Sequence, residues 1–310
     1  MGAFSWTQRI QRAEILLERY EYARDVLNFT REVLQFQKDV YDFVDQRLGP
    51  EVFASPTSVR QLLSERWGIF VYDDTERPLR SDFLDTHLPM LFPHFFEFLD
   101  RIRRVGPPTL AAVVDQLRNE LTAEAVGRVL QAYWRHEALP TELAETEEDA
   151  SQLQTVLAFL AKLFLQPYAE CLADRYPDKA WLDEVVAEGS QGGLCPLCRS
   201  RPQLSVLRPE AQGTKRSLMC SLCGVEWRFK RICCPACGEE RFWNLAYYKT
   251  EAFPHVRVEA CLRCRRYLKG VDLSVDGHAV PLVDEVAALP LDLWAGEQGF
   301  QKIELNVVGG

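Results

Sequence analysis

Apolar residues in the first 185 positions recur every three or four residues, which is the spacing of one face of an α-helix. The clearest stripe lies in residues 5–48, where Ser5 and Gln8 match a capping box and Gly49-Pro50 is a stop signal. We therefore expect residues 5–48 to be helical, with the stripe facing a core.

The same periodicity predicts further helices before residue 185, separated by turn-rich or acidic stretches. Proline and glycine punctuate these segments, and the acidic run has the composition of a solvated connection. The predicted helices are Ser58–Trp67, Leu91–Val105, Leu110–Glu120, Ala123–Glu137 and Leu153–Ala173, with turns over 72–89 and an acidic linker over 140–149.

The pattern changes after Gly189–Gly193, a glycine-rich stretch typical of linkers. Short runs with strand-like composition follow it, and cysteine pairs separate these runs. We expect strands near 203–207, 225–229, 242–248 and 256–259. Helical periodicity returns over 281–299, where Pro290 interrupts it and where Val283, Val286, Leu289 and Leu293 are expected on one side.

Nine of the ten cysteines lie within this second half, and eight of them form four Cys-x-x-Cys pairs. The first and second pairs are separated by 21 residues, the second and third by 10, and the third and fourth by 23. The long gaps suit a hairpin that carries the chain from one pair to the pair facing it. We therefore predict two groups of four: Cys195, Cys198, Cys220 and Cys223, and Cys234, Cys237, Cys261 and Cys264.

Four thiolates at this spacing are typical of a tetrahedral metal site. The N-terminus lacks the pattern of a signal peptide, so we expect a cytoplasmic protein in which metal is a better interpretation than disulfides. A cross-paired or binuclear arrangement and reduced thiols without metal are the alternatives. Each group is expected to hold one ion, and thiolates suit iron as well as zinc.

Two cysteines remain outside the predicted groups. Cys233 is an alternative ligand to Cys234, but only Cys234 keeps the two-residue spacing to Cys237. Cys171 lies on a predicted helix face and is interpreted as a small buried apolar residue. The five histidines lie at no ligand spacing from an acid or a cysteine, so structural or surface roles are expected for them.

These patterns together predict a multi-domain fold. An α-helical N-terminal domain is followed by two small β modules of the rubredoxin-like or zinc-ribbon kind and a short C-terminal helix. The predicted boundaries are 1–188, 189–230, 231–272 and 273–310.

Charge is unevenly distributed along the chain, whose formal net charge is −9. Residues 190–270 carry 15 Lys and Arg against 6 Asp and Glu, whereas the segments before and after them are acidic. A basic centre between acidic flanks indicates a charged docking surface or an internal electrostatic match. The longest apolar candidate, Val156–Leu165, is broken by Lys162, so we expect no membrane insertion.

Longer strings around the cysteines are more specific than a generic ribbon. They include Cys195-Pro-Leu-Cys198-Arg-Ser-Arg-Pro202, Cys220-Ser-Leu-Cys223-Gly-Val-Glu226-Trp227, Arg231-Ile-Cys-Cys234-Pro-Ala-Cys237, Cys261-Leu-Arg-Cys264-Arg-Arg-Tyr267-Leu268-Lys269 and, near the end, Val283-Asp-Glu-Val-Ala-Ala-Leu289-Pro-Leu-Asp292 ahead of Gly299-Phe300. Over residues 195–300 the chain resembles the FdhE family of accessory proteins for formate dehydrogenase maturation. Over residues 1–185 the resemblance rests on helical character alone.

The resemblance implies a cytoplasmic, non-catalytic helper. Such a protein would bind the catalytic subunit of a respiratory formate dehydrogenase, a molybdenum or tungsten enzyme, and support its maturation before export. Family members bind iron in these modules, which brings iron level with zinc, and the eight cysteines correspond position by position. The oligomeric state does not follow from the sequence.

Two other functions compete with this one. A basic ribbon pair suits nucleic-acid binding, although the acidic flanks would repel a phosphate backbone. Iron–thiolate sites also suit a rubredoxin-like redox protein. The aromatic residues Trp227, Trp243, Tyr247, Tyr248 and Tyr267 either face a partner or fill the small ribbon cores. No nucleophile–base pair, phosphate loop or open metal position is recognisable in the sequence, so an enzyme is not expected.

Overall fold

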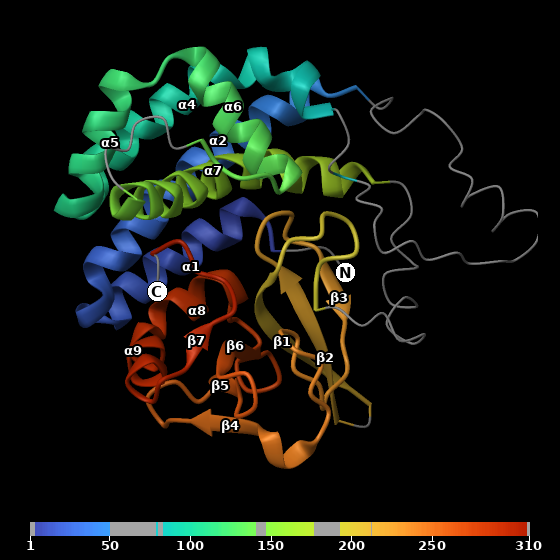
Figure 1. The fold of residues 1–310 in the computed structure, drawn as a ribbon. Coiled ribbons are helices and arrows are strands. Elements are labelled where there is room, and N and C mark those ends of the chain that lie inside the picture. Colours follow the sequence, from blue (N-terminus) through green and yellow to red (C-terminus); the bar gives the residue numbers. More distant parts are fainter. Residues whose placement is uncertain are drawn as a thin grey trace, which may run out of the picture.

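The computed structural model describes residues 4–49, 79, 83–140, 147–176, 193–211 and 213–308. Helices from the first half of the chain form a layer above a sheet built from the second half, and two short C-terminal helices lie beside that sheet (Figure 1). The predicted order of helical region, cysteine-bearing strands and short C-terminal helix is therefore confirmed. The helix expected at Ser58–Trp67 and the linker before Gly193 lie outside the described residues.

The first predicted helical segment is a helical hairpin rather than one continuous helix. Helix α1 (Trp6–Arg19) begins with the predicted capping box, in which Ser5 and Gln8 bond each other's backbone N–H groups. The backbone breaks at Tyr20, η1 (Glu21–Ala23) turns the chain, and α2 (Arg24–Arg47) returns against α1. The sequence at this break contains no glycine or proline. We attribute the break to the packing of α1 on α2.

Helix α4 begins eight residues before the predicted start and contains two prolines. It extends over Phe83–Val105 with Pro89 and Pro93 inside it, although the sequence suggested turns as far as Pro89. Proline inside a helix removes one backbone hydrogen bond and disturbs the preceding turn. Burial of apolar side chains such as Leu84 and Phe95 in the main core offsets that cost. Helices α5 (Pro108–Glu120) and α6 (Ala123–Arg135) follow close to their predicted positions.

Helix α7 (Glu147–Arg175) is the central helix of the molecule. Its segment Ala150–Arg175 is long and apolar enough to cross a membrane by length and composition, but 78% of the most apolar stretch is buried inside the protein. It also carries Lys162 and Glu170, which are buried and paired. This helix is therefore a core helix of the fold.

The strands form a single sheet in which the two cysteine-bearing segments are joined. The strand order is β3-β2-β1-β6-β5-β4, and β7 pairs with the first two residues of β6. A parallel pairing of β1 with β6 joins the two halves. The β6–β7 pair is also parallel, and the remaining pairs are antiparallel. The strands are β1 (Pro202–Glu210), β2 (Gly213–Cys220), β3 (Glu226–Arg228), β4 (Leu245–Lys249, after the short helix η4, Phe242–Asn244), β5 (Val256–Cys261), β6 (Arg266–Asp272) and β7 (Gln301–Lys302).

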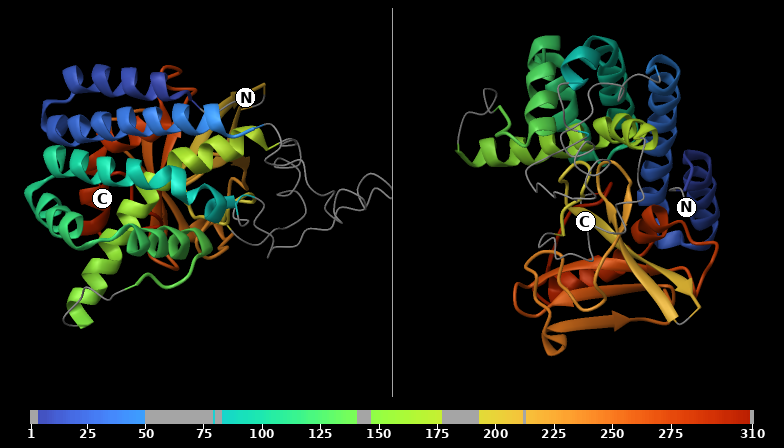
Figure 2. Two further views of the ribbon diagram at one scale, coloured as in Figure 1. Left: turned by 90° about the horizontal axis from the view of Figure 1, so that it is seen from above. Right: turned by 90° about the vertical axis from the view of Figure 1, so that its right-hand side faces the viewer.

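The C-terminal segment packs on the second half of this sheet. Helices α8 (Pro281–Ala287) and α9 (Leu289–Glu297) occupy the predicted helical stretch, but Leu293 is exposed rather than on the buried side. A second hydrophobic core, which includes Leu291 and Phe300, joins α9 to β5 and β6. The two views in Figure 2 show these helices lying between the sheet and α1.

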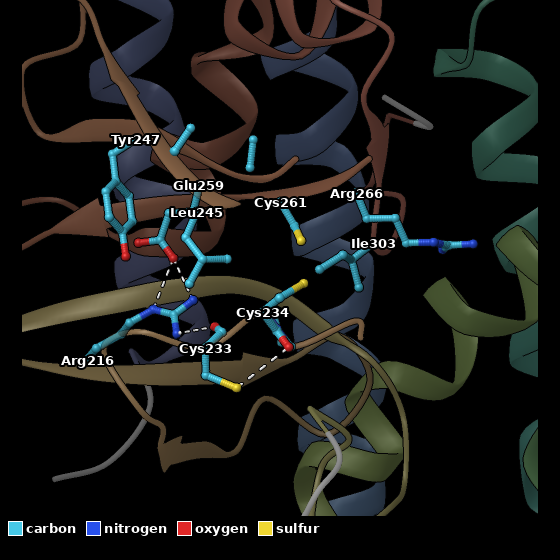
Figure 3. A pocket seen from close by; sticks show the side chains of 12 residues that line it. Arg216, Cys233, Cys234, Leu245, Tyr247, Glu259, Cys261, Arg266 and Ile303 are labelled. Carbon is cyan, nitrogen blue, oxygen red and sulfur yellow. Dashed lines mark hydrogen bonds and ion pairs between the residues drawn. The ribbon is translucent and has the colours of Figure 1, made fainter. Parts of the chain in front are cut away.

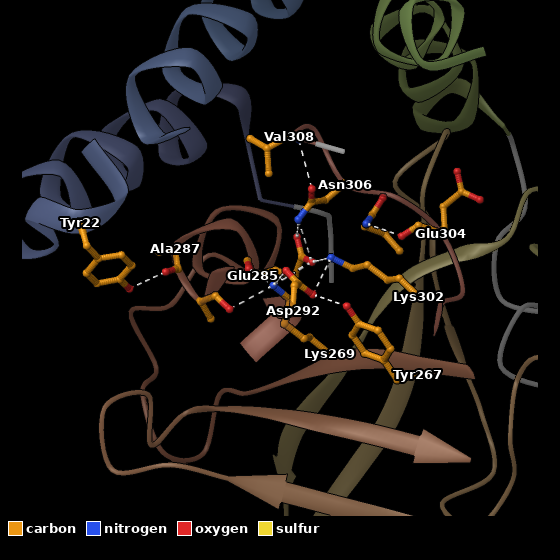
Figure 4. Close-up of polar contacts among 12 residues, drawn as sticks. Tyr22, Tyr267, Lys269, Glu285, Ala287, Asp292, Lys302, Glu304, Asn306 and Val308 are labelled. Carbon is orange, nitrogen blue, oxygen red and sulfur yellow. Dashed lines mark hydrogen bonds and ion pairs between the residues drawn. The ribbon is translucent and has the colours of Figure 1, made fainter. Parts of the chain in front are cut away.

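Buried charges fasten the C-terminal segment. Lys269 on β6 is fully buried and contacts Asp292 at 2.5 Å, and Lys302 contacts Glu285 at 2.5 Å and Asp292 at 3.0 Å (Figure 4). The two lysines lower the pKa of Glu285 to about 2, overcoming the opposite effect of its burial. Such a set holds one geometry because breaking any contact leaves a buried charge unpaired.

Candidate metal centres

Four cysteines meet beneath the helical layer and form what we call cluster 1: Cys195, Cys198, Cys220 and Cys223. All four are buried, and their sulfur atoms lie within 4.8 Å of one another. The Sγ atoms of Cys195 and Cys223 are 3.6 Å apart, and those of Cys198 and Cys220 are 3.3 Å apart. One pair precedes β1 and the other follows β2, so the β1–β2 hairpin brings them together.

The other four cysteines form cluster 2, in the half of the sheet that contains β4, β5 and β6: Cys234, Cys237, Cys261 and Cys264. The Sγ atoms of Cys234 and Cys264 are 3.7 Å apart, as are those of Cys237 and Cys261. Here the β4–β5 hairpin carries the chain between the two pairs. The grouping in both clusters is the one that the gap lengths predict.

The distances fit a four-coordinate metal site. Zinc–sulfur bonds of about 2.3 Å place the corners of a regular tetrahedron about 3.8 Å apart. The observed separations of 3.3–3.7 Å are close to this edge. They are far longer than a disulfide bond of about 2.05 Å. Four soft thiol donors suit zinc or iron and leave no coordination position for a substrate.

A left-handed residue follows the second cysteine of every pair. Gly224 and Gly238 have φ angles of 64° and 71°, and Arg199 and Arg265 have φ angles of 60° and 59°. This conformation closes the turn so that the residue's N–H bonds the first cysteine's C=O, as from Arg199 to Cys195 at 2.8 Å. Arginine at two of these positions carries the backbone strain that glycine avoids.

Backbone N–H groups also point at sulfur in cluster 1. The N–H groups of Leu222 and Cys223 donate to the Cys220 Sγ, each at 3.4 Å. Hydrogen bonds of this kind stabilise a thiolate and tune the potential of an iron–sulfur centre. The local turn thus directs two N–H donors at a sulfur that would be anionic if it bound a metal ion.

Cluster 1 belongs to the main hydrophobic core together with the helices. All four of its cysteines share one continuous cluster of buried side chains with residues of α2, α4, α6 and α7. The Glu170 side chain of α7 lies against Gly224, and the C=O of Leu197 accepts a bond from the Leu79 N–H at 3.1 Å. The ion pair of Arg9 with Glu170 at 2.9 Å ties α1 to the same place. The helical region therefore covers cluster 1.

Cluster 2 lies at the surface. Cys237 is exposed and Cys264 is partly buried, whereas Cys234 and Cys261 are buried. Figure 3 shows a small pocket beside this cluster, in which Arg216 contacts Glu259 at 2.6 Å. None of its four cysteines is among the residues of the main core, which distinguishes it from cluster 1.

The acidities of the thiols differ between the clusters. Burial raises the pKa values of Cys195 and Cys223 well above the usual range of a thiol. Burial also raises the pKa of Cys264, to about 11. The pKa of Cys237 is lowered, since hydrogen bonds from the Glu239 N–H and neighbouring thiols outweigh the opposite effect of burial. A bound cation would displace these protons, so loading of either cluster is linked to proton release.

The two remaining cysteines stand apart from both clusters. Cys233 is half-buried, and its Sγ–H is directed at the Cys234 C=O at 3.8 Å (Figure 3). Cys234, and not Cys233, completes the second group. Cys171 is fully buried as predicted, but it is not purely apolar in its contacts. The Arg175 guanidinium donates to its sulfur at 2.9 Å.

One buried polar group was not foreseen from the sequence. His255 contacts Asp284 at 2.9 Å, and Asp276 lies close to both. The Arg12 guanidinium binds Asp284 at 2.6 Å and Asp276 at 3.1 Å, so a positive charge already occupies the centre of this group. We interpret it as an ion-pair network that fastens α1 to the C-terminal half. The residues are too far apart in sequence for spacing to reveal it.

The structure separates the aromatic residues into two sets. Trp227 and Tyr267 are buried in ribbon cores, and Tyr248 packs against Trp294 with ring centroids 4.7 Å apart. Trp243 and Tyr247 are exposed beside cluster 2. Filling a core therefore applies to the first set, whereas the exposed second set is free of a core and its contact with a partner stays a prediction.

Part of the basic charge is matched internally. Arg208 binds Glu226 at 2.8 Å, and Arg216 and Arg257 both bind Glu259 at 2.6 Å. Other cations of the basic centre, such as Arg231, Arg241 and Arg263, are exposed close to cluster 2 in the sequence.

The fold and the site together define a class of protein. In this class a helical region covers one four-cysteine ribbon of a shared sheet, and a second four-cysteine ribbon lies at the surface. Family models for the FdhE central domain and the FdhE C-terminal domain match residues 194–231 and 230–308. Over residues 194–308 the chain is therefore similar to the FdhE family.

Individual relatives agree with this assignment. An FdhE homolog from Aquifex aeolicus is 33% identical over 157 residues, covering 50% of this chain and 52% of that protein. One from Edwardsiella ictaluri is 31% identical over 202 residues, covering 64% of this chain and 63% of that protein. The chain thus spans between about half and two thirds of the length of these relatives.

A solved structure extends the likeness in fold to nearly the whole chain. The crystal structure of the FdhE protein from Pseudomonas aeruginosa matches with a TM-score of 0.63 at 23% identity. The match covers 98% of this chain and 95% of that one. The helical region, where sequence similarity is low, therefore shares its fold with that protein.

Proposed function

We propose that this protein is a cytoplasmic, non-catalytic accessory factor. It binds the catalytic subunit of a respiratory formate dehydrogenase and supports maturation of that enzyme before export. Similarity to the FdhE family over residues 194–308 is the observation that carries the proposal. The two closed cysteine clusters support a non-catalytic role, since four thiolates leave no open position on the metal.

Each cluster, in this proposal, holds one ion of iron or zinc. Cys195, Cys198, Cys220 and Cys223 are the ligands in cluster 1, and Cys234, Cys237, Cys261 and Cys264 are those in cluster 2. The metal supplies folding energy to ribbon modules built around single hairpins, which are marginally stable alone. The donor distances are compatible with either metal.

The first test combines metal analysis with capture of the client. We expect anaerobically purified protein to contain two metal ions per chain and to retain the formate dehydrogenase catalytic subunit in a pull-down. Deletion of its gene should lower the activity of that enzyme. Failure to retain the subunit, together with unchanged enzyme activity in the deletion strain, would contradict the proposed function.

A redox role is the second candidate, and the exposure of cluster 2 favours it. Cys237 reaches the surface, so an iron ion in cluster 2 would lie within reach of a docked partner. We expect a red protein that bleaches reversibly with dithionite if this role applies. A colourless protein with two zinc ions would eliminate it and leave the clusters as structural sites.

A further inference from the structure

Exposed apolar side chains gather around cluster 2. Ile232, Phe242, Trp243, Tyr247 and Leu262 are each 41–68% exposed, and they make up half of the large exposed apolar residues in the described part of the chain. The Phe242 and Trp243 rings are in contact, with centroids 5.1 Å apart. The Tyr247 hydroxyl bonds the backbone beside Ile232, at the Arg231 C=O. These residues form one surface, which we call the β4 face.

Strand β4 forms an open edge within this face. It is the last strand of the sheet and pairs only with β5, and Figure 1 shows it at the side of the sheet farthest from the helical layer. The Leu262 N–H donates to the Asn244 C=O at 2.8 Å. Opposite residues in an antiparallel ladder alternate between hydrogen-bonded and non-hydrogen-bonded pairs. Ala246 and Tyr248 therefore also bond β5, whereas the N–H groups of Tyr247 and Lys249 point outward.

An open edge of this kind is a ready template for another strand. No backbone group elsewhere in the described chain accepts a hydrogen bond from the Tyr247 or Lys249 N–H. Proteins often recognise an extended peptide by adding it to such an edge. Main-chain bonds then supply affinity, and alternate side chains supply specificity.

The charge of the β4 face indicates what kind of segment would bind. Between residues 228 and 266 the chain has nine Lys and Arg but only four Asp and Glu. One of those acids, Glu239, is bound by Arg241 at 2.8 Å and Arg263 at 3.6 Å, and a second, Glu259, is buried. The surface is therefore cationic and complements an acidic segment.

The aliphatic part of the face favours a protein over a nucleic acid as the occupant. Ile232 and Leu262 are exposed and offer no stacking surface to a base. Aromatic and arginine side chains around an apolar centre are typical of protein interfaces.

We propose that an extended acidic segment of a partner protein adds to β4 as a further strand. Its apolar side chains lie on Trp243 and Tyr247, and its carboxylates face the arginines around cluster 2. The inference rests on the proposed function, because the partner in question is the formate dehydrogenase catalytic subunit. It adds the surface and the mode of recognition.

Hydrogen exchange measured on the metal-loaded full chain tests the mode of binding. In the free protein the amides of Tyr247 and Lys249 should exchange fast, and those of Ala246 and Tyr248 slowly. In the complex with the catalytic subunit the first two should become protected. Unchanged exchange at Tyr247 and Lys249 in a saturated complex would overturn strand addition.

Substitutions test the surface itself. The double change Phe242→Ser and Trp243→Ser removes two exposed rings, so folding should be retained while affinity for the subunit falls at least tenfold. Ile15→Ser, at an equally exposed apolar residue on α1, is the matched control and should bind normally. Lys249→Pro removes an outward N–H without breaking the β5 ladder, and Lys249→Ala is its control.

The outcomes separate this inference from the proposed function. If the unaltered protein retains no catalytic subunit, both fail. If the unaltered protein and the double variant retain it equally, the β4 face is not the docking surface, although the proposed function stands. If the unaltered protein binds oligo(dT) and the double variant does not, the occupant is a nucleic acid. If the unaltered protein forms a dimer in sedimentation and the double variant does not, the occupant is a second copy. Either result overturns the proposal.

Discussion

The two cysteine clusters share the Cys-x-x-Cys pairs but differ in their surroundings. Cluster 1 is buried in the main core beneath α7, whereas cluster 2 lies at the surface beside an open strand edge. Similar cysteine turns can therefore occupy different environments within one sheet. The first joins the sheet to the helical region, and the second, in the inference above, faces a partner.

The difference between the two clusters follows from the side chains that pack against their cysteine turns. Glu170 of α7 contacts Gly224 in cluster 1, whereas the space around Gly238 in cluster 2 is open. Stability should therefore depend more on cluster 1, and recognition more on cluster 2. The predictions below test this difference.

The largest effect is expected from a matched pair of ligand substitutions, Cys223→Ser and Cys237→Ser. Cys223 is buried in the main core, so its loss should release one metal and destabilise the helical region by several kcal/mol, a part of the roughly 10–16 kcal/mol with which structural zinc sites bind their metal. Cys237→Ser should weaken metal binding at cluster 2 and leave the helical region folded. Metal content and thermal unfolding followed by far-UV circular dichroism measure both.

The comparison fails if the two variants lose helical signal at the same temperature. That result would mean that the clusters stabilise one cooperative unit despite their different burial. Retention of two metal ions in either variant would contradict the assignment of these cysteines as ligands.

A smaller effect is expected from adding a methyl group at matched glycines. Gly224→Ala and Gly238→Ala both place a Cβ on a left-handed residue, which costs about 1 kcal/mol. At Gly224 the Cβ would also approach the Glu170 carboxyl carbon and oxygen at 3.0 Å, whereas at Gly238 nothing lies within 4 Å. We expect Gly224→Ala to cost about 1–3 kcal/mol more.

Denaturant unfolding of the two glycine variants gives the difference directly. Equal losses would show that the contact between α7 and cluster 1 relaxes without cost. A loss of metal in Gly238→Ala would show instead that the turn at cluster 2 tolerates no side chain, although Arg265 occupies the equivalent position of the same cluster.

The local features of both clusters were predictable from the sequence, but their surroundings were not. The gap lengths predict which cysteines meet, and the Ser5 capping box predicts where the first helix begins. Both are local, since they depend on residues connected by a short stretch of chain. The burial of cluster 1 under α7 depends on contacts between distant segments, which no local pattern records.

The same reasoning explains the errors in the fold. The sequence did not predict strands β2 and β6, because their apolar and polar residues alternate poorly. In β6, for example, the fully buried position 269 holds a lysine, Lys269. The parallel pairing of β1 with β6, which makes one sheet of two ribbons, has no signature in either strand. The break at Tyr20 and the prolines inside α4 are tertiary effects that override local preference.

The smallest effect concerns the two cysteines outside the clusters at alkaline pH. Burial raises the pKa of Cys171 to about 12, from an ordinary value of 9.0. Between these values the unfolded chain releases the thiol proton and the folded chain keeps it. The free energy of unfolding should therefore fall as pH rises from 9, by up to about 1.4 kcal/mol per pH unit, with no contribution below pH 9.

Cys171→Ser removes this ionisation while keeping a group that can accept from Arg175, so the fall above pH 9 should become shallower. Cys233→Ser is the comparison near cluster 2, where half-burial should make the change in slope smaller. Denaturant unfolding at pH 9.0, 9.5 and 10.0 measures both slopes. The metal sites should stay loaded, because thiolate ligands are favoured at high pH. An unchanged slope in Cys171→Ser would contradict the burial of that thiol. A larger change in Cys233→Ser would reverse the difference in burial that separates the two regions.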